Sequence, residues 1–579
     1  MAINWYGNQS QSEACNFGAL AVIYPLLQRM KVAEIIDQHV PADPRAEFPY
    51  SKVLSMLMAA RLYRPTALSN VAAWAADTGA DILWDIPIDK INDDRFGRAL
   101  DAFFPQRHSI LAHLALTVSR EFGVPLTEVH FDPTHILFTG AYQDAEPREG
   151  VVGKDEVRSD EQLQPAQITK GRATDDAPDG ALMVHAGICT YVDEFGPLPF
   201  FGHTLDGNQN GHTAVAEQFA LFRKHLKPTQ LTMISDRGTF SVGHLLRLQK
   251  EKFHALCSAP WHEFRPLFDE QRTRLKWKKA SYLSIEQQRR RKDQSDLPLE
   301  HYELAEVEHT LSDPESKQTI PVRVLFVFST ADQKVVRQQR QKQLAKLREG
   351  LEYIQRSVAA GNRSTHPAAI ARRVEKLFGS KQAARYFPWE MVPLNEEELK
   401  ALPRPRRGCQ SPTHRFVFRF DEKALREDEA YDGYAALVTT VPKKGDDKDA
   451  LFTKFKQQNF CEHVNHEFKG PVAVRPVFLH SPQRVEALIF LLLMALTAYF
   501  LLQRIYRQSL PKQAKPKERR TTAETILRAF NSYVLLIHKS RLGREVQPTR
   551  LNTRQRELLQ QLGFPSPAQV LSQLLPRGP

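Results

Sequence analysis

Apolar residues recur at helical spacing through most of the first 120 residues. The intervals of three and four residues run through 20–36, 53–62, 68–74 and 110–118, with turn signals between them. In INDDRFGRALDAFF, 91–104, a helix is expected to start at Asn92 or Asp93 and to bury Leu100 and Phe103. We therefore expect a helical N-terminal domain, which either binds DNA, mediates assembly or is an ordinary bundle with its arginines in solvent.

The periodicity changes to alternation near residue 127. In TEVHFDPTHILFTG, Val129 and Phe131 alternate with His130 and Asp132, and Pro133 follows. Because proline cannot donate to a strand ladder, we expect a first strand to end at Asp132 and a second extended stretch to follow it.

Further strands are predicted up to residue 236. Residues 141–179 are polar and aperiodic and are expected to form a mobile loop, whereas 181–193 and 198–208 alternate like strands. The short apolar run 231–234 leads to Asp236. This pattern is typical of a buried strand that delivers a carboxylate to a sheet edge, although such an aspartate is often only a turn residue.

Residues 242–430 do not repeat this pattern and are expected to form an inserted domain. They contain an extended segment, 320–329, and a long charged helix, 333–351. Their basic clusters lie at Lys276, Lys278 and Lys279, at 289–292, and at Arg404, Arg406 and Arg407. Interleaved with Trp277 and Tyr282, such clusters are compatible with nucleic-acid backbone contacts or with a solvated face. A strand is expected again at 431–441.

The segment FTKFKQQNFCEHVNHEFKGP, 452–471, predicts one helix that stops at Gly470. One side of that helix would carry Phe455, Gln458, Glu462 and Lys469. The opposite, buried side would carry Phe460, Cys461, Val464 and Phe468. Glu462 is therefore expected to point away from the core, either as a metal ligand beside a phosphate-binding Lys469 or as part of a solvated charged face.

Charge and cysteine content narrow the function classes without choosing one. The chain of 579 residues has 79 Lys and Arg against 67 Asp and Glu, a net charge of +12. A basic chain of this size suits a polyanionic partner, a class that includes nucleic acid, ribosomes and membrane surfaces. Its cysteines have no paired spacing, which fits a reducing cytoplasm, and no secretory signal is evident at the N-terminus.

The continuously apolar run 487–502 requires a choice between a membrane span and a core helix. It is shorter than the roughly 20 residues that a bilayer core needs. Ser481 and Pro482 precede it as N-cap and first-turn residues, and Glu486 lies inside the same helix. We expect a soluble helix that is buried all round. A membrane protein built on 485–506 is the alternative.

The order of these elements resembles the DDE transposases of bacterial insertion sequences. It is similar in particular to the group named after insertion sequence four, which has a large insertion and the helix signature Tyr, two residues, Arg, three residues, Glu, six residues, Lys. Here the spacing is kept by Phe455, Gln458, Glu462 and Lys469. Matching blocks run in order from about 30 to 505. Phe455 and Gln458 replace the tyrosine and arginine, which removes a hydroxyl and a cation that would touch DNA.

The resemblance implies an α+β multidomain chain. Its parts would be a helical N-terminal domain (1–122), a ribonuclease-H-like catalytic domain in two parts (123–241 and 431–508) separated by the insertion domain (242–430), and a basic, partly helical C-terminal region (509–579). It also implies an enzyme that cuts DNA at the ends of an insertion sequence and joins the 3′-OH ends to target DNA.

The same resemblance implies a site and partners. Asp132, Asp236 and Glu462 would be catalytic and hold two Mg²⁺ ions, with Mn²⁺ as a substitute, since hard cations take carboxylate oxygens. Lys469, Gln458 and Phe455 would contact DNA. The partners would be terminal inverted repeats and target DNA, bound by a homodimer in the cytoplasm, associated with the nucleoid and without a membrane. The alternatives are an inactive sequence-specific DNA-binding protein and a ribonuclease-H-like nuclease without strand transfer.

Overall fold

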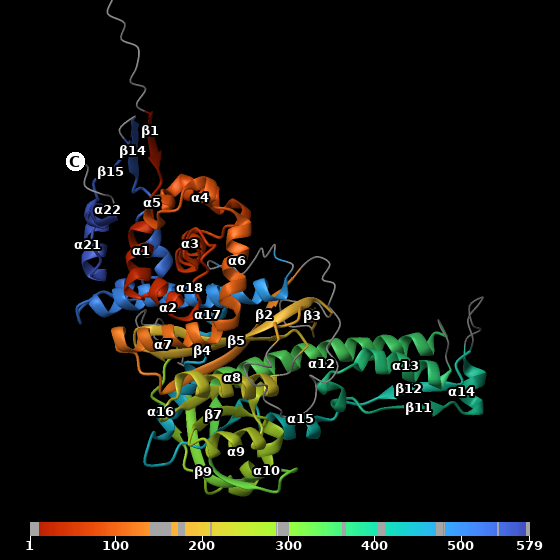
Figure 1. The fold of residues 1–579 in the computed structure, drawn as a ribbon. Coiled ribbons are helices and arrows are strands. Elements are labelled where there is room, and N and C mark those ends of the chain that lie inside the picture. Colours follow the sequence, from red (N-terminus) through yellow and green to blue (C-terminus); the bar gives the residue numbers. More distant parts are fainter. Residues whose placement is uncertain are drawn as a thin grey trace, which may run out of the picture.

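The structure is a computed structural model. It describes residues 11–138, 164–171, 180–208, 211–284, 287, 300–361, 366–402, 411–470, 479, 481–540 and 543–574. Of the expected mobile loop, 141–179, only 164–171 is described, and the basic clusters at 289–292 and 404–407 lie outside the described residues. Figure 1 shows a helical body, a sheet below it and an arm that projects to one side.

The N-terminal segment is helical, as its periodicity predicts. Its helices are α1 (Leu20–Arg29), α2 (Val32–His39), α3 (Tyr50–Tyr63), α4 (Val71–Thr78), α5 (Ala80–Trp84), α6 (Asp93–Phe103) and α7 (Arg107–Phe122), with 3₁₀ turns at Leu68–Asn70, Ile88–Lys90 and Phe104–Gln106. Asn92 caps α6 by accepting a hydrogen bond from the backbone N–H of Arg95. Leu100 and Phe103 are buried, so the expected face of this helix is confirmed.

The C-terminal region completes this helical body. It contains α19 (Pro516–Arg519), α20 (Ala523–Arg528), β14 (Leu535–Ser540), β15 (Gly543–Pro548), α21 (Thr553–Leu562) and α22 (Pro567–Leu574). β14 pairs antiparallel with both β15 and β1 (Gln11–Cys15), so strands near the two ends of the chain share one sheet. The sequence predicted a basic, partly helical region here and no strand. Leu535 and Ile537 bury alternate positions of β14 in the main core, which the tertiary partner β1 makes possible.

The central sheet has ten strands within the described residues. In spatial order they are β5 (Gly196–Asp206) and β3 (Thr169–Lys170), both paired with β4 (Leu182–Asp193), then β2 (Glu128–Leu137), β6 (Thr232–Ser235), β7 (His254–Ala259), β13 (Tyr434–Thr439), β10 (Thr319–Ser329), β9 (Tyr302–Ser312) and β8 (Lys278–Lys279). β2, β6 and β7 are parallel, and the other pairings are antiparallel. The helices that follow these strands are α8 (Gly211–Leu226), α9 (Val242–Lys250), α10 (Trp261–Gln271), α16 (Lys448–Lys456) and α17 (Asn459–Lys469).

β2 does not end at Asp132, which corrects the prediction from Pro133. The strand continues through Pro133, which lies opposite Gly187 of β4. The ladder with β6 stops at the pair Phe131 and Ser235. Beyond that pair β2 is paired with no strand of the described residues on the β6 side, so a proline there removes no ladder donor on that side.

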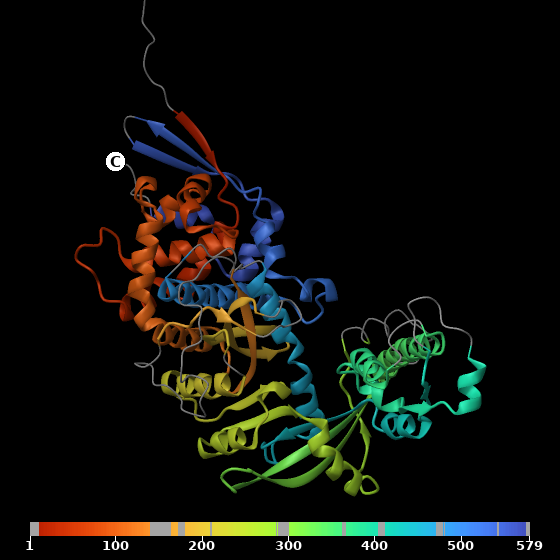
Figure 2. The ribbon, with the colours of Figure 1, turned by 90° about the vertical axis from the view of Figure 1, so that its right-hand side faces the viewer.

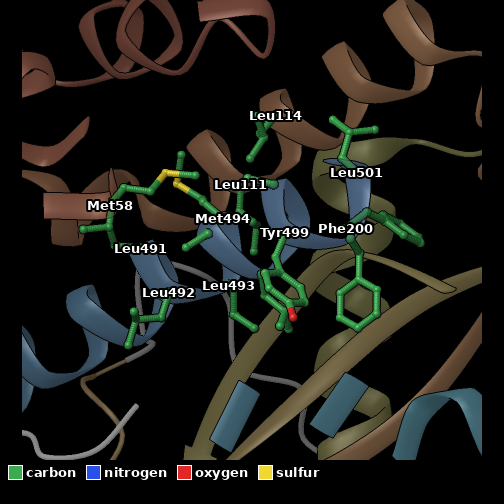
Figure 3. Close-up of a cluster of buried hydrophobic side chains, with 14 of the residues drawn as sticks. Met58, Leu111, Leu114, Phe200, Leu491, Leu492, Leu493, Met494, Tyr499 and Leu501 are labelled. Carbon is green, nitrogen blue, oxygen red and sulfur yellow. The ribbon is translucent and has the colours of Figure 1, made fainter. Parts of the chain in front are cut away.

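The helix α18 (Pro482–Ser509) forms the centre of the core, as expected for 487–502. It is the one helix in the described part of the chain that is long and apolar enough to span a membrane, and its apolar window is fully buried in the protein. It packs against α3, α6, α7 and β5. Figure 3 shows Leu491, Met494 and Leu501 of this helix among the side chains of neighbouring helices. The prediction of a core helix in place of a membrane span is confirmed.

The arm has its own hydrophobic core. It contains α12 (Thr330–Ala359), α13 (Pro367–Phe378), a 3₁₀ turn (Gln382–Tyr386), β11 (Trp389–Pro393), α14 (Glu396–Ala401), β12 (His414–Phe418) and α15 (Glu422–Glu429). Figure 2 shows this lobe standing away from the body. The independent lobe is thus shorter than the predicted 242–430, because β7, β8, β9 and β10 belong to the central sheet.

Candidate active site

Asp132 and Asp236 each lie one position beyond the same pair of residues in the central sheet. Phe131 of β2 lies opposite Ser235 of the parallel strand β6, and the next residue of each strand is Asp132 and Asp236. Asp236 is exposed and begins the 3₁₀ turn Arg237–Thr239, whereas Asp132 is partly buried. The two adjacent parallel strands therefore place both aspartates one position beyond the same pair, although only Asp236 follows the end of its strand as the sequence predicts.

The helix that carries Glu462 is shorter than expected. The predicted single helix is divided at Gln457 and Gln458 into α16 and α17, so the expected common stripe of four residues is wrong. Phe455 lies on α16 and packs against the apolar cluster on that face of the sheet. Both helices bury one face, so apolar residues keep their helical spacing across the break. The sequence therefore contains no signal that a helix stops there.

On α17 the orientation of Glu462 is as predicted. Cys461, Val464 and Phe468 are buried, while Glu462 is exposed on the other side. One turn further along, Asn465 donates a hydrogen bond from Nδ2 to Oδ2 of Asp132 at 2.7 Å. This bond joins the helix of the glutamate to the strand of the first aspartate.

The electrostatics of Asp132 show that both Asp236 and Glu462 act on this carboxylate. Burial, followed by the negative charges of Asp236 and Glu462, raises the pKa of Asp132 to about 7. The hydrogen bond from Asn465 and the positive charge of Lys469 act in the opposite direction. Lys469 is the last residue of α17, so the helix places a cation close to the same carboxylate.

Gln458 fastens the start of α17 to β2. Its Nε2 donates to the backbone carbonyl of Phe131 at 3.0 Å, and its Oε1 lies 3.0 Å from Nδ1 of His130. Burial lowers the pKa of His130 to about 4, so the imidazole is neutral near pH 7 and donates to Gln458. DNA contact by Gln458 stays a prediction, and both ends of its amide already bond to β2.

Sequence reasoning missed two residues of this site. His130 stands two positions before Asp132, and Asn465 stands three positions after Glu462. The available signal was spacing, since a residue three positions along a helix shares the side of Glu462. Their partners lie more than 300 positions away in the chain, which no local pattern specifies.

The donor set at this edge fits divalent cations, although it is not preassembled. Within the described residues no three His, Cys, Asp or Glu side chains lie close enough to form a metal-binding group. Carboxylate oxygens are nevertheless the ligands that Mg²⁺ prefers. The repulsion that Asp236 and Glu462 exert on Asp132 is the interaction that a bound cation would relieve. Asp132, Asp236 and Glu462 are therefore the residues that would hold such ions.

The match to a known protein family lies within the helical body. Residues 13–116 match a protein-family model described as a domain of unknown function, DUF4277. The match includes α1 to α6 and part of α7, and it leaves Asp132, Asp236 and Glu462 outside. Comparison with curated proteins gives no match.

Proposed function

We propose that this protein is a DDE-type transposase that cuts DNA at the ends of an insertion sequence and joins the 3′-OH ends to target DNA. One observation carries the proposal. Asp132 lies inside β2 and Asp236 directly follows the adjacent parallel strand β6, each one position beyond the pair Phe131 and Ser235, and the charge of Glu462 from α17 acts on the same Asp132. Carboxylates gathered in this way, called the carboxylate edge below, suit phosphodiester chemistry with divalent cations, because carboxylate oxygens are the ligands that Mg²⁺ prefers.

The order of the sheet supports a ribonuclease-H-like catalytic domain. β5, β4 and β2 are antiparallel neighbours, and β6 and β7 continue the sheet in parallel with β2. α17 returns from a distant part of the sequence to pack against β2 and β5. The central strand thus carries the first aspartate and receives the glutamate helix.

The residues of the edge have separate roles in this proposal. Asp132, Asp236 and Glu462 would hold two Mg²⁺ or Mn²⁺ ions, which when bound activate the attacking oxygen and stabilise the leaving oxygen. Lys469 contacts a backbone phosphate as a point charge at the end of α17. Asn465 and Gln458 position Asp132 by holding α17 against β2.

The partners follow from the same reaction. Two element ends have to be held together, so the working unit is a homodimer bound to terminal inverted repeats and target DNA. The net charge of +12 supports binding to a polyanion and an association with the nucleoid in the cytoplasm.

The test is incubation of the purified protein with labelled DNA from its own flanking termini in Mg²⁺ or Mn²⁺, followed by a denaturing gel. We expect cuts at the element boundary and joined products with wild type, and neither with Asp132→Ala, Asp236→Ala or Glu462→Gln. Asp89→Ala, at an exposed aspartate of the helical body, is the matched control.

Three other outcomes would change the assigned site or the proposed function. Cleavage that persists in Asp132→Ala would overturn the assigned site. Cleavage without joined product would indicate a nuclease of the same fold. No cleavage by wild type, together with specific binding of the ends in a native gel-shift assay, would indicate an inactive DNA-binding protein.

A further inference from the structure

The N-terminal part of α12 from 333 to 348, called its first half below, has charged side chains of one sign. Between Asp332 and Glu349 the helix contains lysine, arginine and glutamine but no aspartate or glutamate. Nearly all of this half is exposed, and its first fully buried residue is Leu347, where the core of the arm begins. It is therefore a solvated helical connection between the central sheet and the lobe.

The two sides of this half differ in their contacts with the rest of the protein. On one side Arg337 and Arg340 bind the buried carboxylate of Asp432, with Arg340 Nη1 at 2.8 Å and Arg337 Nε at 3.2 Å from Oδ2. Asp432 precedes β13, so these pairs fix the base of the arm to the sheet. The carboxylate of Asp432 thus neutralises part of the positive charge on this side, because one carboxylate faces two guanidinium groups.

The other side carries a stripe of side chains without such neutralisation. Lys334, Gln338, Lys342 and Lys346 follow one another at intervals of four residues, and all four are exposed. Positions four apart lie on the same side of a helix, so the stripe is continuous and about 18 Å long. We name it the lysine stripe.

The lysine stripe is unfavourable for an isolated helix. None of its lysines forms an ion pair or hydrogen bond with a described residue, although exposed polar helices are usually stabilised by pairs of opposite charge. Like charges four residues apart, as at Lys342 and Lys346, instead destabilise an isolated helix. A linear run of unneutralised cations is complementary to a polyanion.

The position of α12 relates the stripe to the carboxylate edge. One row of the sheet contains, in spatial order, Phe131, Ser235, Cys257, Val438 and Val324. β10 runs in the same direction as β2, so its end at Ser329 lies beyond this row on the side of Asp132 and Asp236, by about 16 Å along the strand. α12 begins at the next residue and extends away from the body (Figures 1 and 2).

We propose that Lys334, Lys342 and Lys346 bind the phosphate backbone of double-stranded DNA beyond the carboxylate edge. The inference rests on the proposed function and assigns a part of the DNA path to this helix. At about 3.4 Å per base pair, a stripe of about 18 Å follows about five base pairs. Val335 and Val336 are the large exposed apolar residues described on this half, and two valines supply little anchor for a protein partner.

The experiment compares three proteins by fluorescence anisotropy with a labelled duplex of about 30 base pairs of arbitrary sequence, at salt from about 0.05 to 0.3 M. They are wild type, the stripe variant Lys334→Gln, Lys342→Gln, Lys346→Gln, and a control variant Lys376→Gln, Lys400→Gln, Lys423→Gln. The control lysines are exposed on α13, α14 and α15 and give the same change in net charge. Glutamine keeps helix propensity, and circular dichroism checks that each variant folds.

We expect the slope of log affinity against log salt to fall by about 2 to 3 in the stripe variant and to stay at the wild-type value in the control. At about 0.1 M salt the affinity of the stripe variant should be lower by roughly two orders of magnitude. Equal slopes in all three proteins would overturn the inference and leave the proposed function intact. Wild type that binds no duplex would count against the proposed function itself.

Discussion

Asn465 donates a hydrogen bond from Nδ2 to Oδ2 of Asp132 across 2.7 Å, and its own Oδ1 is buried without a partner among the described residues. The bond favours the charged form of Asp132, while burial and the charges of Asp236 and Glu462 favour the protonated form. The second set of effects is the larger, because the pKa of Asp132 lies at about 7. The metal-free edge is therefore electrostatically strained at neutral pH.

This strain predicts how the stability of the metal-free protein changes with pH. Since the folded protein binds the Asp132 proton more tightly than the unfolded chain does, the stabilisation is complete below about pH 4 and is lost as pH rises to about 7. Asp132→Asn has no such loss. In EDTA at pH 8 we expect the free energy of unfolding of Asp132→Asn to exceed that of wild type by about 2 kcal/mol. The difference should be smaller at pH 5, and urea unfolding measures both values.

Asp89→Asn, at an exposed residue of the helical body, is the control for this comparison. It should follow the wild-type curve at both pH values. A wild-type protein that loses no stability relative to Asp132→Asn between the two pH values would contradict the assigned strain.

Divalent cations should reverse the same effect. A cation that binds only the folded protein adds about 2.7 kcal/mol when its free concentration is about 100 times its Kd. At pH 8 we expect Mg²⁺ or Mn²⁺ to raise the melting temperature of wild type and to leave that of Asp132→Asn and Glu462→Gln nearly unchanged. Differential scanning fluorimetry measures this shift. An equal shift in Glu462→Gln would remove the glutamate from the metal site.

Gln458 is expected to matter for folding independently of DNA. Gln458→Ala leaves the buried carbonyl of Phe131 and the ring of His130 without their partners from α17. An unsatisfied buried group costs about 1–3 kcal/mol, so we expect a loss of about 2 kcal/mol in urea unfolding. Gln339→Ala, at an exposed position of α12, should change little. Equal stability of the two variants would show that the contact with β2 contributes nothing.

The parts of the site that sequence predicts are those fixed by local patterns. A short apolar run followed by a carboxylate predicted Asp236 at a sheet edge, and the helical spacing of Cys461, Val464 and Phe468 predicted the outward side of Glu462. The division of the helix at Gln458 has no local signal in the sequence, and the partners that Gln458 bonds there lie on a strand that is distant in the sequence.

The same distinction applies to the fold. The helices around Leu100 are determined by periodicity and capping, which are local. The pairing of β1 with β14 joins positions more than 500 residues apart, so propensity in the segment around Ile537 did not reveal a strand. Pro133 gave a misleading signal because a proline is excluded from a ladder only where the adjacent strand requires its N–H.

Glu486 gives the last prediction, because its partner explains why a carboxylate lies in an apolar helix. Arg107 of α7 donates from Nε to Oε1 at 2.6 Å, and the backbone N–H of Ala166 donates to Oε2 at 2.6 Å. The side chains of Arg107 and Glu486 are only 4% and 2% exposed, so solvent does not screen the pair. Glu486→Gln keeps an acceptor for Ala166 and removes the charge opposite Arg107.

Breaking a buried pair on one side costs about 3–5 kcal/mol, because the remaining charge is uncompensated. We therefore expect Glu486→Gln to unfold at lower urea concentration, with a free energy of unfolding lower by about 3 kcal/mol. The double variant Arg107→Met, Glu486→Gln should regain more than half of this loss, since it leaves no buried charge. Glu422→Gln, in the exposed pair with Arg426, is the control and should unfold like wild type. If the double variant is less stable than Glu486→Gln, the loss comes from packing around Arg107 and not from its charge.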